Sequence, residues 1–175
     1  MIQKELTALG EDADAKRLGD YLLERAEHVV TAESCTGGLI GGALTSVVGS
    51  SQWFDQGWIT YTNRAKHEQL GVSKETLKAF GAVSEQVAKQ MASGALAMAP
   101  RANLALAVTG IAGPGGGSVD KPVGLVWFGF ACRRGSEVVV SATHQIFEGD
   151  RQAVRAATVQ FSLRHALAWL KQDQP

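Results

Sequence analysis

The hydrophobic residues of the chain follow two patterns in turn, continuous apolar runs and stripes at helical spacing. Short apolar runs bounded by polar or glycine residues are typical of buried strands, whereas a spacing of three and four residues is typical of amphipathic helices. The runs predict strands at 28–33, 53–61, 104–109, 123–132 and 138–147. The stripes and their capping residues predict helices at 15–26, 37–47, 63–70, 73–80, 84–100 and 150–170.

Two of the predicted strands belong at the centre of a sheet. The runs 104–109 and 123–132 are apolar without alternation, which is typical of a strand covered on both faces. Segment 138–147 alternates, so we expect it nearer an edge, and the short turn "RRGS" at 133–136 joins it to 123–132 as an antiparallel hairpin. The order of helices and strands predicts a three-layer α/β/α domain with a mixed sheet.

Length and charge limit the kinds of partner. The 175 residues, 45% of them hydrophobic, predict a single domain over 1–175 with its core at about 15–170. Seventeen Lys and Arg balance seventeen Asp and Glu without a block of like charge, so we expect no nucleic-acid partner. Small molecules and other protein chains remain as partners.

No segment suggests export, a membrane or a metal. The N-terminus does not resemble a signal peptide and no later apolar run is long enough to span a bilayer, so we expect a cytoplasmic protein without a membrane partner. Cys35 and Cys132 are far apart and are expected to be free buried thiols. The four histidines occur singly, without metal-binding spacing, so we infer no metal and no cofactor.

Three polar or glycine-rich segments follow predicted strands, where α/β domains place their sites. They are "ESCTGG" at 33–38, "YTNRAK" at 61–66 and "TGIAGPGGGSVDKPVG" at 109–124. In the first segment, Ser34 precedes a predicted helix at which the amides of Cys35, Thr36 and Gly37 can point toward an anion. The alternative is that Ser34 or Thr36 only caps the helix, and the local sequence alone favours that alternative.

The glycine-rich segment is a candidate phosphate-binding loop. It contains Gly110, Gly113, Gly115, Gly116 and Gly117, and so many missing Cβ atoms let backbone amides approach a phosphate or a carbonyl oxygen. Lys121 adds a nearby positive charge. The segment matches neither a Walker loop nor a dinucleotide-binding motif. A flexible turn and a solvated lysine are the alternatives.

Tyr61 and Lys66 are both placed where they can reach Ser34. A serine hydroxyl is a weak nucleophile and needs a neighbouring base; without a suitably grouped histidine, tyrosine or lysine must serve if there is catalysis. Burial lowers the pKa of a lysine, which would let Lys66 act as a base. The alternative is an exposed helix residue, which would be the better interpretation without the other two segments.

Longer segments of the chain resemble a known family. The segments are "TAESCTGGLI", "YTNRAKHEQLGV", "GAVSEQVA", "LALAVTGIAGPGGGSVDKPVGLVW" and "FEGDRQAVR", and together they resemble the CinA C-terminal domain family over about 15–170. This family includes stand-alone nicotinamide-nucleotide amidases. The resemblance implies a three-layer α/β/α fold with a five-stranded mixed sheet. It also implies hydrolysis of nicotinamide mononucleotide to nicotinic acid mononucleotide and ammonia, a step of pyridine nucleotide salvage.

The resemblance further implies roles for individual residues. Ser34 would be the nucleophile, with Tyr61 and Lys66 as its activating partners, and Thr109 and Gly110 would line the amide end of the pocket. Amides at the start of the 37–47 helix would stabilise the oxyanion, and the amides of 113–117 with Lys121 would hold the substrate phosphate. Two other functions stay open: a nucleotide-binding module without catalysis, and a regulatory or interaction protein of the kind that the family's competence and damage-inducible name suggests.

The last predicted helix carries more apolar surface than one sheet-packing face requires. One side has Val159, Leu163, Leu167 and Leu170, and another has Ala153, Ala157, Phe161 and Ala168. We therefore expect a homo-oligomer and favour a homodimer, because closed two-fold pairing is the commonest assembly. Arg151 and Arg155 are expected either at the rim of that interface or on a solvated helix end.

Overall fold

The computed structural model describes the backbone of residues 2–172 and the side chains of residues 13–172. The helices are α1 (Ile2–Glu24), α2 (Leu39–Thr45), α3 (Asn63–Leu70), α4 (Lys74–Phe80), α5 (Glu85–Met98) and α6 (Arg151–Gln172), with a short 3-10 helix, η1 (Ser50–Gln52). The strands are β1 (Val29–Glu33), β2 (Phe54–Ile59), β3 (Leu104–Gly110), β4 (Leu125–Arg134) and β5 (Glu137–Ile146). All five predicted strands and six predicted helices are therefore confirmed.

The five strands form one mixed sheet in the order β2-β1-β3-β4-β5. Strand β1 pairs in parallel with β2 and β3, whereas β4 runs antiparallel to both β3 and β5. The predicted hairpin is confirmed, although its turn is tighter than "RRGS", because Arg133 and Arg134 still pair with Val138 and Glu137. The carboxyl ends of β1, β2 and β3 therefore meet at one edge of the sheet.

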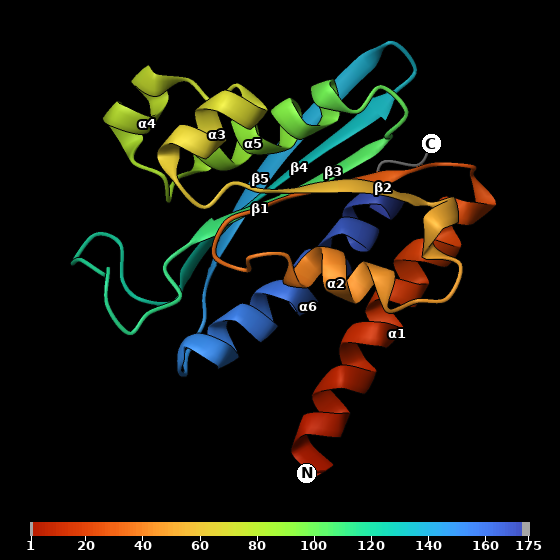
Figure 1. Ribbon diagram of the computed structural model, residues 1–175, viewed down its shortest axis with the longest axis horizontal. Helices are drawn as coiled ribbons and strands as arrows, with labels where there is room; N and C mark the ends of the chain where they lie inside the picture. Colours follow the sequence, from red (N-terminus) through yellow and green to blue (C-terminus); the bar gives the residue numbers. More distant parts are fainter. Residues whose placement is uncertain (1, 173–175) are drawn as a thin grey trace.

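Helices cover both faces of the sheet, as Figure 1 shows. One core lies between the sheet and α1, α2 and α6, and a second lies between the sheet and α3, α4 and α5. Strand β1 and nearly all of β3 are buried, because both faces are covered. This two-sided burial explains the unbroken apolar runs in the sequence and confirms the three-layer α/β/α fold with a five-stranded mixed sheet.

Three predicted boundaries differ from the structure. Helix α1 begins at Ile2 rather than near Ala15, and Asp14, inside the helix, is buried and pairs with Arg164 of α6. Helix α2 begins at Leu39 rather than at Gly37, because Gly37 and Gly38 have φ values of 60° and 103° and form the preceding turn. Strand β2 ends at Ile59, so Tyr61 lies beyond it.

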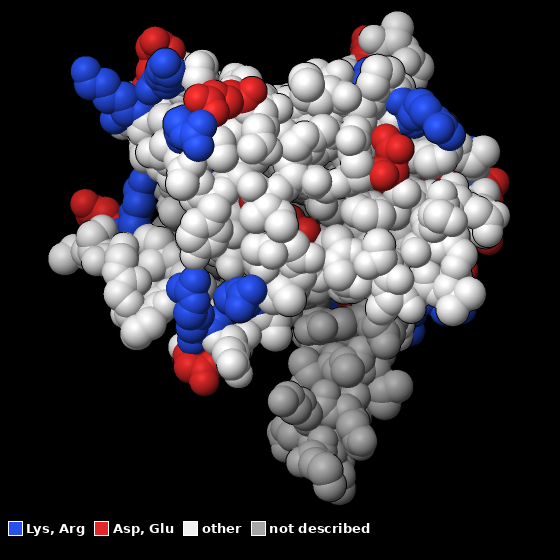
Figure 2. All heavy atoms as spheres, in the orientation of Figure 1, with Lys and Arg blue, Asp and Glu red and all other residues white. Residues whose placement is uncertain are grey.

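Charged side chains are mixed over the face that Figure 2 presents. Lys and Arg alternate there with Asp and Glu around a largely uncharged centre, as the balanced composition leads one to expect. None of the helices in the described part of the chain has the length and apolarity needed to cross a membrane.

Candidate active site

A cavity of about 200 Å³ lies at the sheet edge where β1, β2 and β3 end. We call it the Ser34 cavity; its lining residues are Ser34, Cys35, Tyr61, Lys66, Ala82, Val83, Thr109, Gly110, Ala112 and Arg151. The fold thus brings residues of all three candidate segments to one place, together with the first residue of α6. Six of the eleven residues singled out as candidate site residues line this cavity.

Ser34 is held at the end of β1 with its hydroxyl toward a lysine. The Ser34 amide donates to the Val108 carbonyl at 3.1 Å, which extends the pairing between β1 and β3. The Lys66 Nζ donates to Ser34 Oγ at 2.9 Å. The N-cap of α2 is Gly38, which makes no side-chain capping bond, so the interpretation of Ser34 as a helix cap is wrong.

Lys66 lies on α3 and is 1% exposed, so the interpretation as an exposed helix residue is also wrong. Its Nζ also donates to the Thr60 carbonyl at 2.7 Å. Burial lowers the pKa of Lys66 from 10.5 to about 8, because the ammonium form loses its hydration. A fraction of Lys66 is therefore neutral near neutral pH and able to accept a proton.

Cys35 is the other nucleophile type in the Ser34 cavity. Its thiol is buried and, like that of Cys132, forms no disulfide, which confirms the two free buried thiols. Burial raises the pKa of Cys35 from 9.0 to about 11. The thiolate is therefore scarce at neutral pH, and of the two side chains it is Ser34 that is hydrogen-bonded to Lys66 Nζ.

The start of α2 already holds an anion, the buried carboxylate of Glu33. This carboxylate accepts hydrogen bonds from Thr36 Oγ1 at 2.6 Å, from the amides of Gly38 and Ile40 at 3.0 Å each, and from the amide of Gly41 at 2.8 Å. The amides of Gly38, Ile40 and Gly41 are therefore occupied by Glu33, whereas the expectation for the amides of Cys35 and Thr36 stays a prediction. Glu33 thus supplies the negative charge that is favourable at a helix N-terminus.

The turn between β1 and α2 nevertheless leaves two amides for another acceptor. The Gly37 amide donates to the Ser34 carbonyl at 3.1 Å. Across residues 2–172, the amides of Cys35 and Thr36 donate to no protein oxygen. These two N–H groups, beside Ser34, are the ones that can meet a developing oxyanion.

Tyr61 reaches the Ser34 cavity from the mouth rather than from the side of Lys66. Its side chain is 57% exposed, and its hydroxyl accepts a hydrogen bond from Arg151 Nη2 at 2.9 Å. The other nitrogen of that fork, Arg151 Nη1, donates to the Gly113 carbonyl at 2.8 Å. The described contacts include no hydrogen bond from Tyr61 to Ser34 or Lys66.

The remaining candidate residues divide between the Ser34 cavity and its surroundings. Thr109 and Gly110 line it, and the Thr109 hydroxyl donates to the Ala82 carbonyl at 2.8 Å. Thr36, Gly37, Gly113, Gly115 and Lys121 lie outside the lining. Lys121 donates to the Phe80 carbonyl and lines a separate groove, and its loop extends away from the body at the left of Figure 1.

Comparison with known proteins settles the family. The model of the CinA C-terminal domain matches residues 11–172. The chain belongs to the CinA C-terminal domain family. Nicotinamide-nucleotide amidohydrolase PncC of Enterobacter agglomerans is 55% identical over 150 residues, which cover 86% of this chain and 89% of that protein. The protein of the same name from Escherichia coli K12 is 46% identical over 164 residues, 94% of each chain.

Solved structures of CinA proteins share the fold. The crystal structure of competence/damage inducible protein CihA from Agrobacterium tumefaciens is 49% identical and superimposes with a TM-score of 0.84. The match covers 91% of this chain and 94% of that one. The CinA fold is therefore conserved over nearly the whole of this chain.

Two arginines of this CinA chain are site residues that sequence reasoning placed elsewhere. Arg151 lines the Ser34 cavity, and Arg155 donates from Nε to the Cys35 carbonyl at 3.1 Å and from Nη2 to the Thr36 carbonyl at 3.0 Å. Arg151 is exposed at the start of α6 and Arg155 is half-buried, and a place for them at the rim of an interface stays a prediction. Both arginines lie in "FEGDRQAVR", a segment that also carries the family resemblance.

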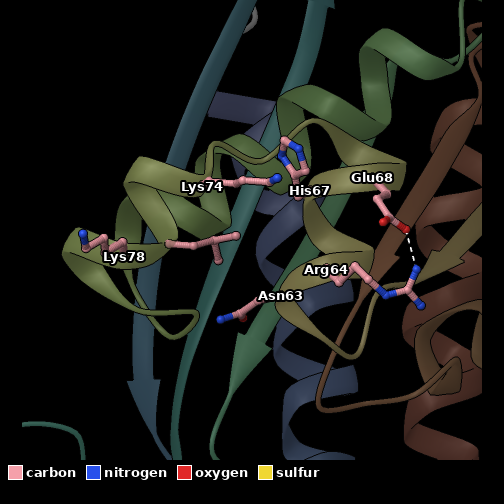
Figure 3. A pocket seen from close by; sticks show the side chains of 7 residues that line it. Asn63, Arg64, His67, Glu68, Lys74 and Lys78 are labelled. Carbon is pink, nitrogen blue, oxygen red and sulfur yellow. Dashed lines mark hydrogen bonds and ion pairs between the residues drawn. The ribbon is translucent and has the colours of Figure 1, made fainter.

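A separate groove of the CinA chain lies away from the Ser34 cavity. A groove of about 480 Å³ between α3 and α4 is lined by Asn63, Arg64, His67, Glu68, Lys74, Leu77 and Lys78 (Figure 3). Arg64 is paired with Glu68 at 2.6 Å, and the two lysines are exposed. None of the residues that line the groove is a serine, a threonine or a cysteine. In the part of the chain that the structure describes, no group of three or more His, Cys, Asp or Glu side chains could hold a metal ion.

Proposed function

We propose that this chain is a nicotinamide-nucleotide amidohydrolase in which Ser34 is the nucleophile and Lys66 its general base. The activity is supported by two relatives of that name, at 55% and 46% identity over most of both chains. The observation that carries the residue assignment is the buried Lys66 Nζ, 2.9 Å from Ser34 Oγ, with its pKa lowered to about 8. A lysine of this kind can take a serine proton near neutral pH.

The proposed reaction begins with the transfer of the Ser34 hydroxyl proton to neutral Lys66. Ser34 Oγ attacks the carboxamide carbon of nicotinamide mononucleotide, and the carbonyl oxygen becomes an oxyanion. The amides of Cys35 and Thr36 stabilise this charge, and Arg155 holds their loop through the Cys35 and Thr36 carbonyls. One such donor typically contributes about 3 kcal/mol to the transition state.

The second half of the reaction releases both products. The Lys66 ammonium returns its proton to the departing nitrogen, and ammonia leaves an acyl-enzyme on Ser34. Water then attacks the ester carbonyl while Lys66 accepts its proton; Lys66 returns that proton to Ser34 Oγ as the ester C–O bond breaks, and nicotinic acid mononucleotide is released. No step requires a metal or another cofactor.

We place the substrate phosphate at Arg151 rather than at Lys121 and Gly115. Arg151 lines the Ser34 cavity, and its guanidinium is oriented by the Gly113 carbonyl and the Tyr61 hydroxyl. A guanidinium suits bidentate binding of a phosphate. Tyr61 then positions Arg151, while Thr109 and Gly110 border the nicotinamide.

Ammonia release from nicotinamide mononucleotide by the purified protein tests the proposal. We expect turnover by the wild type, none by Ser34→Ala, and wild-type turnover by Ser136→Ala, a matched change in the exposed turn of the β4–β5 hairpin. Binding of the nucleotide without ammonia release would support the non-catalytic binding module instead. A protein that ignores the nucleotide would support the regulatory alternative.

The same proposal includes a cytoplasmic homodimer. Its support is a groove of about 440 Å³ along α6 that is lined by Phe147, Ala157, Gln160, Phe161, Arg164, His165 and Ala168. Of the apolar face expected to meet a partner, Ala157, Phe161 and Ala168 line the groove, and Phe161 also packs on Phe128 and Phe147. Light scattering should give twice the chain mass; a monomer mass would reject the dimer without affecting the amidase assignment.

A further inference from the structure

A buried hydroxyl beside the proposed base has no hydrogen-bond partner. Among the described residues, three buried side-chain atoms lack a partner: Glu27 Oε2, Thr60 Oγ1 and Arg134 Nε. Glu27 precedes β1 and Arg134 ends β4, so both lie at the sheet edge opposite the Ser34 cavity. Thr60 alone lies next to the site, because its own carbonyl accepts the hydrogen bond from Lys66 Nζ.

The Thr60 side chain lies on the Lys66 face of the sheet. A Cβ on Gly38 would come within 3.1 Å of Ile59 Cδ1, so Ile59 faces α2. The Thr60 amide donates to the Glu33 carbonyl at 2.8 Å, so the pairing of β2 with β1 continues through Thr60. Successive side chains of such an extended segment point to opposite faces of the sheet. The Thr60 hydroxyl is therefore on the side of α3, and the residue is 0% exposed.

An orphaned hydroxyl at this position has a cost. Burying a hydroxyl without a partner destabilises a protein, whereas an apolar group of the same shape does not. Valine has that shape and suits an extended segment at a strand end. We therefore expect the Thr60 hydroxyl to form a hydrogen bond in a state of the enzyme other than the resting one.

The N–H groups of Lys66 offer a partner for this hydroxyl. A neutral amine has two N–H groups and a lone pair, and an ammonium has three N–H groups. Ser34 Oγ and the Thr60 carbonyl accept two of these hydrogens. The third hydrogen of a buried ammonium needs another acceptor, and a rotation of Thr60 between its staggered χ1 positions moves the unpaired oxygen relative to Lys66.

We propose that Thr60 is a positioning residue whose hydroxyl accepts the third N–H of the Lys66 ammonium that forms when Lys66 takes the Ser34 proton. This inference rests on the proposed function. In the step, the Ser34 O–H bond breaks and a Lys66 N–H bond forms, and the positive charge that appears on Nζ gains a third hydrogen bond. The hydroxyl thus stabilises the ammonium that forms during attack more than the neutral amine from which attack starts.

Thr60→Val tests this role because it keeps the shape and the carbonyl and removes only the hydroxyl. On the plateau of the pH–rate profile, above the pKa of Lys66, we expect kcat to fall at least about tenfold with KM unchanged, as a lost hydrogen bond to a charged group implies. The midpoint of the acid limb of the pH–rate profile should move down by about one unit, because the ammonium form is less stable. Thr60→Ser restores the hydroxyl and should restore both quantities.

Thr158→Val is the matched control, a buried threonine of α6 whose hydroxyl bonds to its own helix at the Val154 carbonyl. Equal kcat losses in Thr60→Val, Thr60→Ser and Thr158→Val would mean a packing effect and overturn the proposal. Unchanged kcat and pH profile in Thr60→Val would overturn it as well.

A readout independent of the reaction separates this inference from the proposed function. The pKa of Lys66 can be measured by NMR titration of lysine-labelled protein, with the Lys66 signal identified by its loss in Lys66→Met. Thr60→Val should lower that pKa by about one unit. An unchanged pKa refutes the role of Thr60, whereas a wild type that releases no ammonia refutes the amidase proposal and leaves this measurement decisive.

Discussion

Replacement of Lys66 by methionine tests whether this lysine is a base made by burial. Methionine keeps much of the length of the side chain and removes the charge, so Lys66→Met should abolish ammonia release while the fold remains. The same change should alter how stability depends on pH. The folded-state pKa of Lys66, about 8, lies below the unfolded value near 10.5, so the unfolded chain binds more protons between these values. Wild-type stability from this group therefore rises with pH through that window.

The size of the effect follows from the two pKa values. A difference of about 2.5 units corresponds to about 3 kcal/mol by which charged Lys66 opposes folding at neutral pH. Between pH 7 and about 9.5, integration over the titration gives a recovery of about 2 kcal/mol. Lys66 is 1% exposed and forms no salt bridge with a described carboxylate, so solvent screening does not reduce this figure greatly.

Urea unfolding at the two pH values measures this recovery. Cys35 acts in the opposite direction, since its raised pKa lowers stability as pH rises above 9, so the quantity to compare is the difference between wild type and variant. We expect wild-type stability to gain about 2 kcal/mol more than that of Lys66→Met over this range. Equal pH dependence in the two proteins, or turnover by Lys66→Met, would refute the reasoning.

Three further predictions follow from the contacts of the site. Glu33→Gln removes the charge that four donors surround and places an NH₂ group against backbone amides. Urea unfolding should therefore show a loss of about 2 kcal/mol or more, whereas exposed Glu148→Gln should stay near wild type. Tyr61→Phe frees one nitrogen of Arg151 and should raise KM more than it lowers kcat; a selective fall in kcat would instead assign Tyr61 to activation of Ser34. EDTA should leave the rate unchanged, and a loss restored by one divalent ion would contradict the metal-free reaction.

The position of the candidate site could be predicted from the sequence because of the parallel strands. Parallel strands joined by crossover connections have their carboxyl ends at the same end of the sheet, so the segments after β1, β2 and β3 had to lie close together. Ser34, Tyr61 and Lys66 were found in this way, with the family resemblance to supply their roles. The contribution of Arg151 and Arg155 could not be found by that rule, because they begin a helix more than 100 residues after Ser34 and act through side chains that reach back to the loops.

The sequence by itself determined the elements and the layers, because the burial of both sheet faces requires unbroken apolar strands and capped amphipathic helices. It did not determine which charges are buried. Glu33 and Ser34 are neighbours in one motif, yet the strand directs the carboxylate to the start of α2 and the hydroxyl to Lys66. Only the packing of α3 over the sheet removes water from Lys66, and that desolvation, a property of the surroundings rather than of the residue, turns an ordinary lysine into a base.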